Sequence, residues 1–326
     1  MEKIEVSVLI PSRNEEFLSW TVDDLLENTN DCTEIIVTLD GAWSQPPMKQ
    51  HPRLNVIYLP EAIGQRQAEK IAARLAKGKY LLKVDAHCNF DKDFDLKMLE
   101  GFKKTGDNVV MLAIMKNLHC YDWKCRKCGC RTYQDKGSTC PDCGRTDMYK
   151  KRVWQGRRGT HATSYCFDST SHFQYFSDYT IRPEYKKDLE ETGFTESMSL
   201  QGSFWMLTKD KYFELDIDND EFGSWGNQGT ATACFFWLSG GKVLVNHNTW
   251  YSHMFRTKGE VFGFPYPQSG REVQKTKDKI KDLFWNGRFE GQTKNLSWLV
   301  EKFSPVPGWS LAELDALKQN EKQRGF

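Results

Sequence analysis

Asp85 and His87 stand one residue apart at the end of an apolar run, KYLLKVDAH (79–87), which predicts a buried β-strand. Alternate residues of an extended segment point to the same side, so a carboxylate and an imidazole can face one cation. This ligand pair suits Mn²⁺ better than Mg²⁺, which prefers oxygen ligands. An Asp-x-His tripeptide also fits a strand-end cap, so the pair indicates a metal site only in company with other motifs.

A second set of potential metal ligands lies in two Cys-x-x-Cys pairs, Cys125 with Cys128 and Cys140 with Cys143. This is the spacing of a zinc ribbon, in which four thiolates hold Zn²⁺ tetrahedrally and leave no open coordination position. We expect a structural zinc that folds this segment and takes no part in chemistry. Cys130 is an alternative to Cys128 as a ligand, and unligated thiols are the alternative to metal binding.

The charge of the chain is unevenly distributed. Residues 116–160 contain 12 Lys or Arg and 4 Asp, a local net charge of +8 (12 − 4), whereas the whole chain has +1 and the remainder therefore −7 (1 − 8). Aromatic side chains are interleaved with these cations, a mixture that suits nucleic acid. A basic island also suits the phosphates of a small ligand, or merely the solvation of a segment that a metal folds.

The first hundred residues alternate predicted strands and helices, as an α/β fold with a mostly parallel, Rossmann-like sheet requires. In such sheets ligands bind at the carboxyl edge, where Asp85 and His87 would lie. The helix over 64–77 is expected to bury Ile71, Leu75 and several alanines on one stripe. Strands are predicted at 5–11, 34–40, 54–59 and 79–87, and helices at 16–28 and 64–77.

The second half of the chain is less regular. Residues 155–195 lack periodicity and are expected to form loops over the site, whereas 199–215 predicts a strand followed by a short helix. A buried helix over 229–241 and a strand over 242–247 follow, and the pattern beyond 270 is helical and charged. We expect two halves of one sheet domain, 1–117 and 151–265, a zinc-ribbon insertion at 118–150, and a helical extension at 266–326.

No signal peptide and no transmembrane span are expected, because the first residues lead directly into a strand and no apolar run reaches ~18 residues. Cysteines in metal-ligand spacing favour reduced thiols. The sequence therefore predicts a cytoplasmic protein with no membrane partner, and it leaves the oligomeric state open.

Seven motifs together, in their order and spacing, resemble the nucleotide-sugar glycosyltransferases of the GT-A fold. The most similar family is that of the polypeptide N-acetylgalactosaminyltransferases. The resemblance covers residues 4–116 and 195–257, and the zinc ribbon has no counterpart in it. The matching segments are VSVLIPSRNEE with Asn14 and Glu15, IIVTLDG with Asp40, GQRQAEKIAA with Gly64 and Arg66, DAHC with Asp85 to Cys88, QGSFWML with Gly202 and Phe204, WGNQG with Trp225 to Gly229, and SHMFR with His253 and Arg256.

This resemblance implies a UDP-sugar donor and a Mn²⁺ or Mg²⁺ ion held by Asp85, His87 and a third ligand, His253. Asp40 would contact the nucleoside, Arg66 the nucleotide or its phosphates, and Arg256 the diphosphate. The implied donor-binding residues are Pro11, Arg13, Asn14, Glu15, Asp40, Gly64, Arg66, Asp85, Ala86, Gly202 and Ser203, and the implied catalytic residues are Asp85, His87, His253, Trp225, Gln228 and Arg256. Structural alternatives are a buried bridging histidine for His253, a turn residue for Asp40, surface positions for the arginines and core packing for Trp225.

One position departs from the family, which has Glu where this chain has Gln228. An inverting transferase needs a carboxylate base, which an amide cannot provide. Asp220 and Glu221 lie close enough in sequence to substitute for it. We expect instead a retaining reaction, as the resemblance implies, in which the donor's own phosphate assists the acceptor.

The leading acceptor is a hydroxyl on a nucleic acid, for instance a hydroxymethylated base in virus-encoded DNA modification. Such a base must be flipped out or single-stranded to reach the metal. Protein Ser or Thr and an envelope glycan are the alternatives, with a hexose or an N-acetylhexosamine as the sugar. A protein of another class, a non-catalytic zinc-ribbon nucleic-acid binder, predicts loss of the metal ligands, and a nucleotidyltransferase would lack the later motifs.

Overall fold

The computed structural model describes residues 3–256, 262–263 and 270–325. Its centre is one mixed β-sheet with the strand order β11-β13-β6-β12-β4-β1-β2-β3, to which β5, β7 and β8 are added at β13 and β6. The strands are β1 (Val6–Ser12), β2 (Thr33–Asp40), β3 (Leu54–Leu59), β4 (Tyr80–Val84), β5 (Cys88–Phe90), β6 (Val109–Cys125), β7 (Arg131–Tyr133), β8 (Met148–Ala162), β11 (Phe194–Glu196), β12 (Phe204–Thr208) and β13 (Lys242–His253), with β9 (Tyr165–Phe167) and β10 (Phe173–Tyr175) as a separate hairpin.

The N-terminal half of the sheet is parallel. β1 lies between β2 and β4, and β3 extends the sheet beyond β2, all in parallel register. β1, β2 and β4 are buried along nearly their whole length, as strands covered on both faces must be. β12 runs antiparallel to β4 and β6, whereas β13 is parallel to β6. The predicted α/β fold is confirmed, with an antiparallel strand between the two parallel groups.

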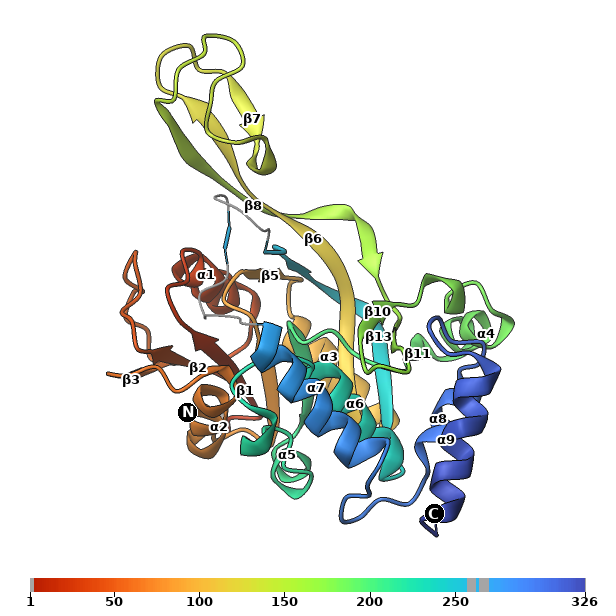
Figure 1. The fold of residues 1–326 in the computed structure, drawn as a ribbon. Coiled ribbons are helices and arrows are strands. Elements are labelled where there is room, and N and C mark those ends of the chain that lie inside the picture. The colour runs from red at the N-terminus through yellow and green to blue at the C-terminus, as the bar shows by residue number, and fades with distance from the viewer. Residues whose placement is uncertain (1–2, 257–261, 264–269, 326) are drawn as a thin grey trace.

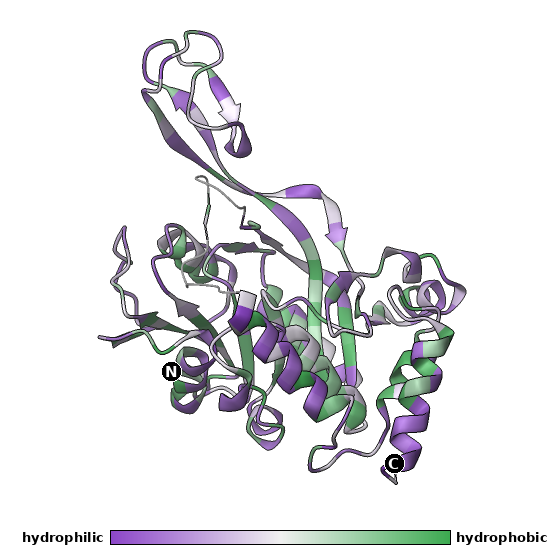
Figure 2. Ribbon diagram, in the orientation of Figure 1, coloured by the Kyte–Doolittle hydropathy of each residue, from purple (hydrophilic) through white to green (hydrophobic). Residues whose placement is uncertain are grey.

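Helices cover both faces of this sheet. In Figure 1, α6 and α7 lie in front of the sheet and α3 lies behind it, while Figure 2 shows the apolar colour concentrated in the central strands. All of α6 is buried, because it is packed between the sheet and the C-terminal helices. The helices are α1 (Leu18–Asn28), α2 (Gln65–Leu75), α3 (Phe94–Thr105), α4 (Pro183–Thr192), α5 (Lys209–Glu214), α6 (Gln228–Leu238), α7 (Gly270–Phe284), α8 (Leu296–Lys302) and α9 (Leu311–Gln323).

The buried face of α2 differs from the predicted one. Leu75 is 60% exposed and Ile71 half-buried, so the expected apolar stripe is wrong in these positions. The helix instead packs its alanines on β1 and β2 and buries two charged residues, Arg66 and Glu69. Buried charges need partners, and theirs lie more than 140 positions later in the chain.

A long hairpin of β6 and β8 projects from the body and carries β7 and the cysteine pairs at its tip (Figure 1). We call it the arm, residues 116–160. The prediction of loops over 155–195 is wrong, because β8 continues to Ala162 and is followed by β9, β10, α4 and β11. The proposed insertion boundaries at 118 and 150 fall inside β6 and β8, so two continuous strands connect the arm to the sheet.

The base of the arm is fixed to α1 by stacked rings and cations. Phe17, Tyr121 and Trp154 belong to a small apolar cluster that also includes Met254, next to the third predicted metal ligand. Lys150 lies over the rings of Phe17 and Tyr121, and its Nζ is 2.6 Å from both carboxylate oxygens of Glu16. Each such contact between a cation and a ring contributes about 0.5–2 kcal/mol. These contacts stabilise β8, whose sequence lacks the alternating apolar residues of a half-buried strand.

The predicted helical extension forms α7, α8 and α9. α8 packs against α9 and α6, while α7 contacts the short 3₁₀ helix at Asp220–Phe222. Within the described residues, none of the helices combines the length and apolar composition of a membrane span.

Candidate active site

The three predicted metal ligands converge at the end of the sheet. β4 ends at Val84, and the chain turns through Asp85 and His87 into β5, which pairs with the end of β13 so that His253 lies opposite Cys88. The Oδ2 atom of Asp85 is 3.2 Å from Nε2 of His253 and 3.7 Å from Nε2 of His87. One potential ligand atom from each residue lies within 4.8 Å of the others.

The protonation states of Asp85 and His253 are those that a metal ligand needs. Burial lowers the pKa of His253 to about 4, so its imidazole is neutral and free to ligate at neutral pH. Burial alone would raise the pKa of Asp85, but Lys83 and the two histidines hold it well below its usual range, so the carboxylate is charged. Nδ1 of His253 has no hydrogen-bond partner among the described atoms. A carboxylate with two imidazoles is a donor set that fits Mn²⁺ and leaves positions open for phosphate oxygens.

Glu15 and Arg256 form a second layer behind the ligands. Oε2 of Glu15 is 3.3 Å from Nδ1 of His87, and Oε1 pairs with the guanidinium of Arg256. Among the described atoms, Oε2 of Glu15 and Nδ1 of His87 have no hydrogen-bond partner, so Glu15 lies beside the His87 ring without a hydrogen bond that would fix its tautomer. Arg256 also donates to the carbonyl of Gly263 and lies 4.4 Å from the ring centre of Phe262. In this conformation Arg256 is therefore held by Glu15, and its predicted diphosphate contact stays a prediction.

A cavity of about 410 Å³ opens beside Asp85. Ligand sites of this kind occupy roughly 300–1,000 Å³. Many of the predicted residues line it, namely Arg66, Asp85, Gly202, Ser203, Trp225 and Gln228. Of the three metal-ligand candidates only Asp85 lines this cavity, whereas His87 and His253 lie next to its Oδ2 atom and do not line it.

Lys83 is a residue of this cavity that the sequence analysis missed. Its side chain is 1% exposed, and its ammonium donates to Oδ1 of Asp85 and to the carbonyl of Gly202. Burial would lower the pKa of Lys83, but Asp85 and Glu69 raise it, so the ammonium stays charged. Because Lys83 occupies one carboxylate oxygen, the other is left facing the histidines. The signal was available: Lys83 precedes Asp85 by two positions, on the same face of a buried strand.

Gln228, which lines the cavity, joins two buried carboxylates. Its Nε2 donates to Oε2 of Glu69 at 2.9 Å and to Oδ1 of Asp218 at 2.8 Å, and Tyr212 donates to the other oxygen of Asp218. Arg66 pairs with Asp218 at 3.5 Å. Burial and the charge of Asp218 raise the pKa of Glu69 well above its usual value. An amide therefore suits this position, because its NH₂ group donates a hydrogen bond to each carboxyl group.

Asp220 and Glu221 do not replace the missing family carboxylate. Their side chains are 72% and 75% exposed, and they pair with Lys70 and Lys279. Neither lines the cavity. Among the described lining residues, Asp85 is the one carboxylate.

The other predicted donor residues surround the same sheet edge. Asp40 is fully buried, and its carboxylate accepts hydrogen bonds from the backbone amides of Ile63 at 2.7 Å and Gly64 at 2.9 Å. It therefore positions the loop that begins α2, where Gly64 has a φ of +99°. Its contact with a nucleoside stays a prediction. Pro11, Arg13, Asn14 and Ala86 lie at the ends of β1 and β4, close to Glu15 and Asp85 in the chain.

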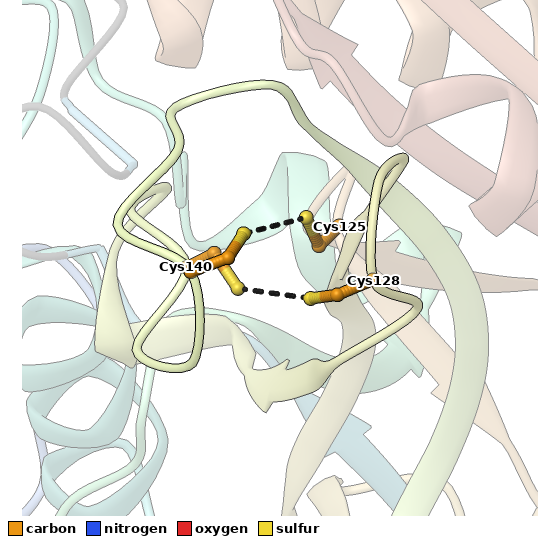
Figure 3. Close-up of side chains that lie close together, drawn as sticks. Cys125, Cys128 and Cys140 are labelled. Carbon is orange, nitrogen blue, oxygen red and sulfur yellow. Dashed lines mark hydrogen bonds between the residues drawn. The ribbon is translucent and has the colours of Figure 1, made fainter.

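The two Cys-x-x-Cys pairs meet at the tip of the arm (Figure 3). The Sγ atoms of Cys125 and Cys143 are 3.7 Å apart, and those of Cys128 and Cys140 are 3.4 Å apart. All four sulfurs lie within 4.8 Å of one another, whereas Cys130 is outside the cluster. Four thiolates at these separations fit a tetrahedral Zn²⁺ with Zn–S distances of about 2.3 Å.

We expect the protein purified without chelator to contain about one tightly bound zinc per chain, measured by mass spectrometry of the metal content. Cys140→Ser should remove it, because the change deletes one of the four sulfur ligands. Cys234→Ser is the matched control, since Cys234 is buried in α6 and belongs to neither metal cluster. Equal zinc content in both variants, or none in the parent protein, would contradict a Cys₄ site.

Parts of the sequence match known proteins. Residues 7–127 match the model of glycosyl transferase family 2. The chain is 24% identical over 286 residues to a putative polypeptide N-acetylgalactosaminyltransferase 13 of Drosophila melanogaster, covering 82% of this chain and 44% of that protein. The sequence comparison thus agrees with the resemblance that the motifs indicate.

Solved structures show the same fold. The crystal structure of GalNAc-T7 with UDP, GalNAc and Mn²⁺ superposes with a TM-score of 0.64 at 16% identity, over 98% of this chain and 54% of the other. That of S. aureus TarS residues 1–349 with UDP-GlcNAc has a TM-score of 0.50 at 14% identity, over 88% and 68%. The fold is therefore GT-A. The chain spans about half the length of the first relatives it matches.

Proposed function

We propose that this protein is a metal-dependent glycosyltransferase that moves a hexose or an N-acetylhexosamine from a UDP-sugar to an acceptor hydroxyl. The observation that carries the proposal is the cluster of Asp85, His87 and His253 beside a ligand-sized cavity in a GT-A fold. Relatives of the fold crystallised with UDP and Mn²⁺ or with UDP-GlcNAc support this donor class.

The residues of the candidate site would have separate roles. A divalent ion held by Asp85, His87 and His253 would neutralise the charge that grows on the departing diphosphate. Lys83 holds the Asp85 carboxylate in place and adds a buried positive charge beside it. The backbone at Gly202 and the side chain of Gln228 lie at the inner end of the cavity, where they would contact the sugar.

We propose that the reaction retains the anomeric configuration. The cavity offers no carboxylate base besides Asp85 among its described lining residues, and Asp85 is a metal-ligand candidate, so the acceptor proton needs another receiver. In this scheme the bond from the sugar C1 to the diphosphate oxygen breaks while the bond to the acceptor oxygen forms on the same face. The proton passes to the diphosphate, and UDP leaves. The anomeric coupling of the product in NMR tests this step, and a β product from an α donor would rule out retention.

We propose a nucleic acid, such as DNA with hydroxymethylated bases, as the acceptor. The arm supports this, because Lys127, Lys151 and Arg158 are exposed, and the described part of the chain places no carboxylate within ion-pair distance of them. Exposed cations without acid partners suit a phosphate backbone. Cysteines in metal-ligand spacing favour reduced thiols, so we propose that the reaction takes place in the cytoplasm.

The proposal is tested by screening UDP-sugars for thermal stabilisation in the presence of Mn²⁺ and then assaying transfer. Oligonucleotides containing 5-hydroxymethyl pyrimidines and Ser- or Thr-containing peptides would be offered as acceptors. We expect a mass gain of one sugar on the oligonucleotide. Transfer to the peptide alone would favour the protein acceptor, and nucleic-acid binding without Mn²⁺-dependent UDP-sugar hydrolysis would favour a non-catalytic binder.

The contribution of the arm can be measured separately. Replacing Lys151 and Arg158 together by Gln should lower the affinity for single-stranded DNA and reduce the slope of log K against log salt by about 1.4, because each neutralised phosphate of a single strand contributes ~0.7. Gel shifts over a salt series measure both. The control changes Lys103 and Lys104 of α3, which lie near Glu100, to Gln. Equal effects of the two double variants would contradict a role for the arm in binding.

A further inference from the structure

One part of the cavity, which we call the outer wall, is built from three segments, two of which lie outside the family-like motifs. The turn between β9 and β10 contributes His172 and Phe173, the loop before α6 contributes Trp225 and Asn227, and α7 contributes Val273 and Lys277. Of these segments, the sequence motifs place only the loop before α6 in the site. The cavity is also lined by the buried Lys83 and by Asp85 and Gly202.

These three segments are fixed to one another by hydrogen bonds. Asn227 donates from Nδ2 to the carbonyl of Ser171 at 3.0 Å, which ties the loop before α6 to the β9–β10 turn. Thr276 donates to the carbonyl of Phe222 at 2.9 Å, which ties α7 to the same region. The turn itself is held by Asp168, whose Oδ1 accepts from the backbone amides of Thr170 and His172. These hydrogen bonds therefore hold the three segments of the outer wall in fixed positions relative to one another.

Its chemistry combines aromatic rings with positive charge. Phe173 and Trp225 are half-buried, so each presents part of its ring to the cavity. Nζ of Lys277 lies 3.4 Å from Nδ1 of His172. In the described part of the chain no carboxylate lies within ion-pair distance of Lys277. Aromatic rings that stack on bases, next to a cation that meets a phosphate, form the usual combination for single-stranded nucleic acid.

The outer wall shares the cavity with one of the metal-ligand candidates. Among these candidates only Asp85 lines the cavity, whereas His87 and His253 lie next to its Oδ2 atom and do not line it. A diphosphate held by a metal at this cluster would therefore lie at the Asp85 end of the cavity. A group bound at the outer wall would reach the sugar through the cavity, and the proposed retaining reaction requires that it attack on the face that the diphosphate leaves.

We infer that the outer wall is the subsite for the acceptor nucleotide: Phe173 and Trp225 contact its base, and Lys277 with His172 binds its phosphate. The inference rests on the proposed nucleic-acid acceptor and deepens it. It assigns a function to α7, which closes the cavity with Val273 and Lys277. It also divides acceptor binding between the arm, which holds the strand at a distance, and the wall, which positions the reacting nucleotide.

The test compares Lys277→Gln with Lys279→Gln, a control two residues along the same helix whose side chain is half-exposed and pairs with Glu221. Transfer from the UDP-sugar to a single-stranded oligonucleotide with one 5-hydroxymethyl pyrimidine is measured over a salt series. For Lys277→Gln we expect the KM for the oligonucleotide to rise about tenfold more than the KM for the UDP-sugar. The slope of log KM against log salt should fall by about 0.7, because the variant neutralises one phosphate fewer. Phe173→Leu, which keeps an apolar side chain but removes the ring, should raise the oligonucleotide KM without changing that slope.

The outcomes separate the subsite from the proposed function. If the oligonucleotide is modified but Lys277→Gln behaves like Lys279→Gln, the subsite is wrong and the nucleic-acid acceptor stands. A KM for UDP-sugar that rises as much as the KM for the oligonucleotide would move Lys277 to the donor side and overturn the inference. If Mn²⁺-dependent hydrolysis of the UDP-sugar occurs but no oligonucleotide is modified, the acceptor proposal and the subsite both fail while the transferase proposal survives.

Discussion

Asp85→Asn should abolish Mn²⁺-dependent hydrolysis and transfer of the UDP-sugar, by on the order of 10³-fold or more. The amide keeps the shape of the side chain but removes the charged ligand shared by the cluster with His87 and His253. A metal ion that stabilises a departing diphosphate is worth several kcal/mol, and each 1.36 kcal/mol corresponds to a factor of ten in rate. Initial rates at saturating Mn²⁺ and UDP-sugar measure the effect.

Binding of Mn²⁺ provides a second measurement that does not depend on turnover. Free Mn²⁺ gives a strong electron paramagnetic resonance signal that disappears on binding, so the dissociation constant of each variant can be titrated. Asp220→Asn is the matched control, because Asp220 is 72% exposed and lies outside the cavity. It should keep the parent rate and affinity within about twofold. Parent-like Mn²⁺ affinity in a folded Asp85→Asn variant would remove Asp85 from the metal site.

The Asp85→Asn variant must also be shown to fold, because Lys83 would lose its carboxylate partner. Leaving a buried ammonium without a paired charge costs several kcal/mol. The double variant Lys83→Met with Asp85→Asn removes both charges, so its midpoint of thermal unfolding should lie above that of Asp85→Asn while its activity remains absent. A rise in stability without activity separates the metal-binding role of Asp85 from its structural pairing.

The sequence predicts those parts of the site that local pattern determines. Asp85 and His87 follow an apolar strand, and their neighbours on β1 and β2 are buried runs of the same kind, so the sheet edge can be placed from a short window. His253 can be placed beside them only through the resemblance, because its partner strand β5 lies more than 160 positions away. The ligand cluster is thus a local signal completed by a long-range pairing.

The two wrong predictions, the loops over part of β8 and the apolar stripe on α2, have the same physical cause. The predicted loop region wrongly includes part of the arm, because β8 lacks alternating apolar residues. The strand is held instead by cations over aromatic rings at the start of α1 and on β6. The predicted stripe on α2 is wrong because Arg66 and Glu69 look like surface residues until Asp218 and Gln228 are brought to them. Periodicity detects burial of apolar groups, whereas these segments are stabilised by pairs of polar groups that are distant in sequence.

Gln228→Glu tests that reading of the buried network. Nε2 of Gln228 donates one hydrogen bond to Glu69 and one to Asp218, at 2.9 and 2.8 Å. Glu at this position would remove both donors and place a third carboxylate between two acids. We expect a decrease of about 3 kcal/mol or more in the free energy of unfolding at pH 8, measured by urea denaturation, and no gain in transferase activity. A more active variant would instead show that the position can supply a catalytic base.

The pH dependence distinguishes charge repulsion from a packing defect. A carboxyl group between two buried acids should titrate well above its usual range, and once protonated it can donate to one of them. The destabilisation caused by Gln228→Glu should therefore shrink as the pH falls from 8 to 5, because its folded-state pKa is raised above the unfolded value and stability declines as pH rises through it. Gln67→Glu makes the same change on the surface, where Gln67 meets the exposed Asp220, and should cost under about 1 kcal/mol. Adding Glu69→Gln to Gln228→Glu returns a donor amide to the network, so it should recover part of the stability. A destabilisation that is constant from pH 5 to 8 and unaffected by Glu69→Gln would mean that Gln228 acts through its shape alone.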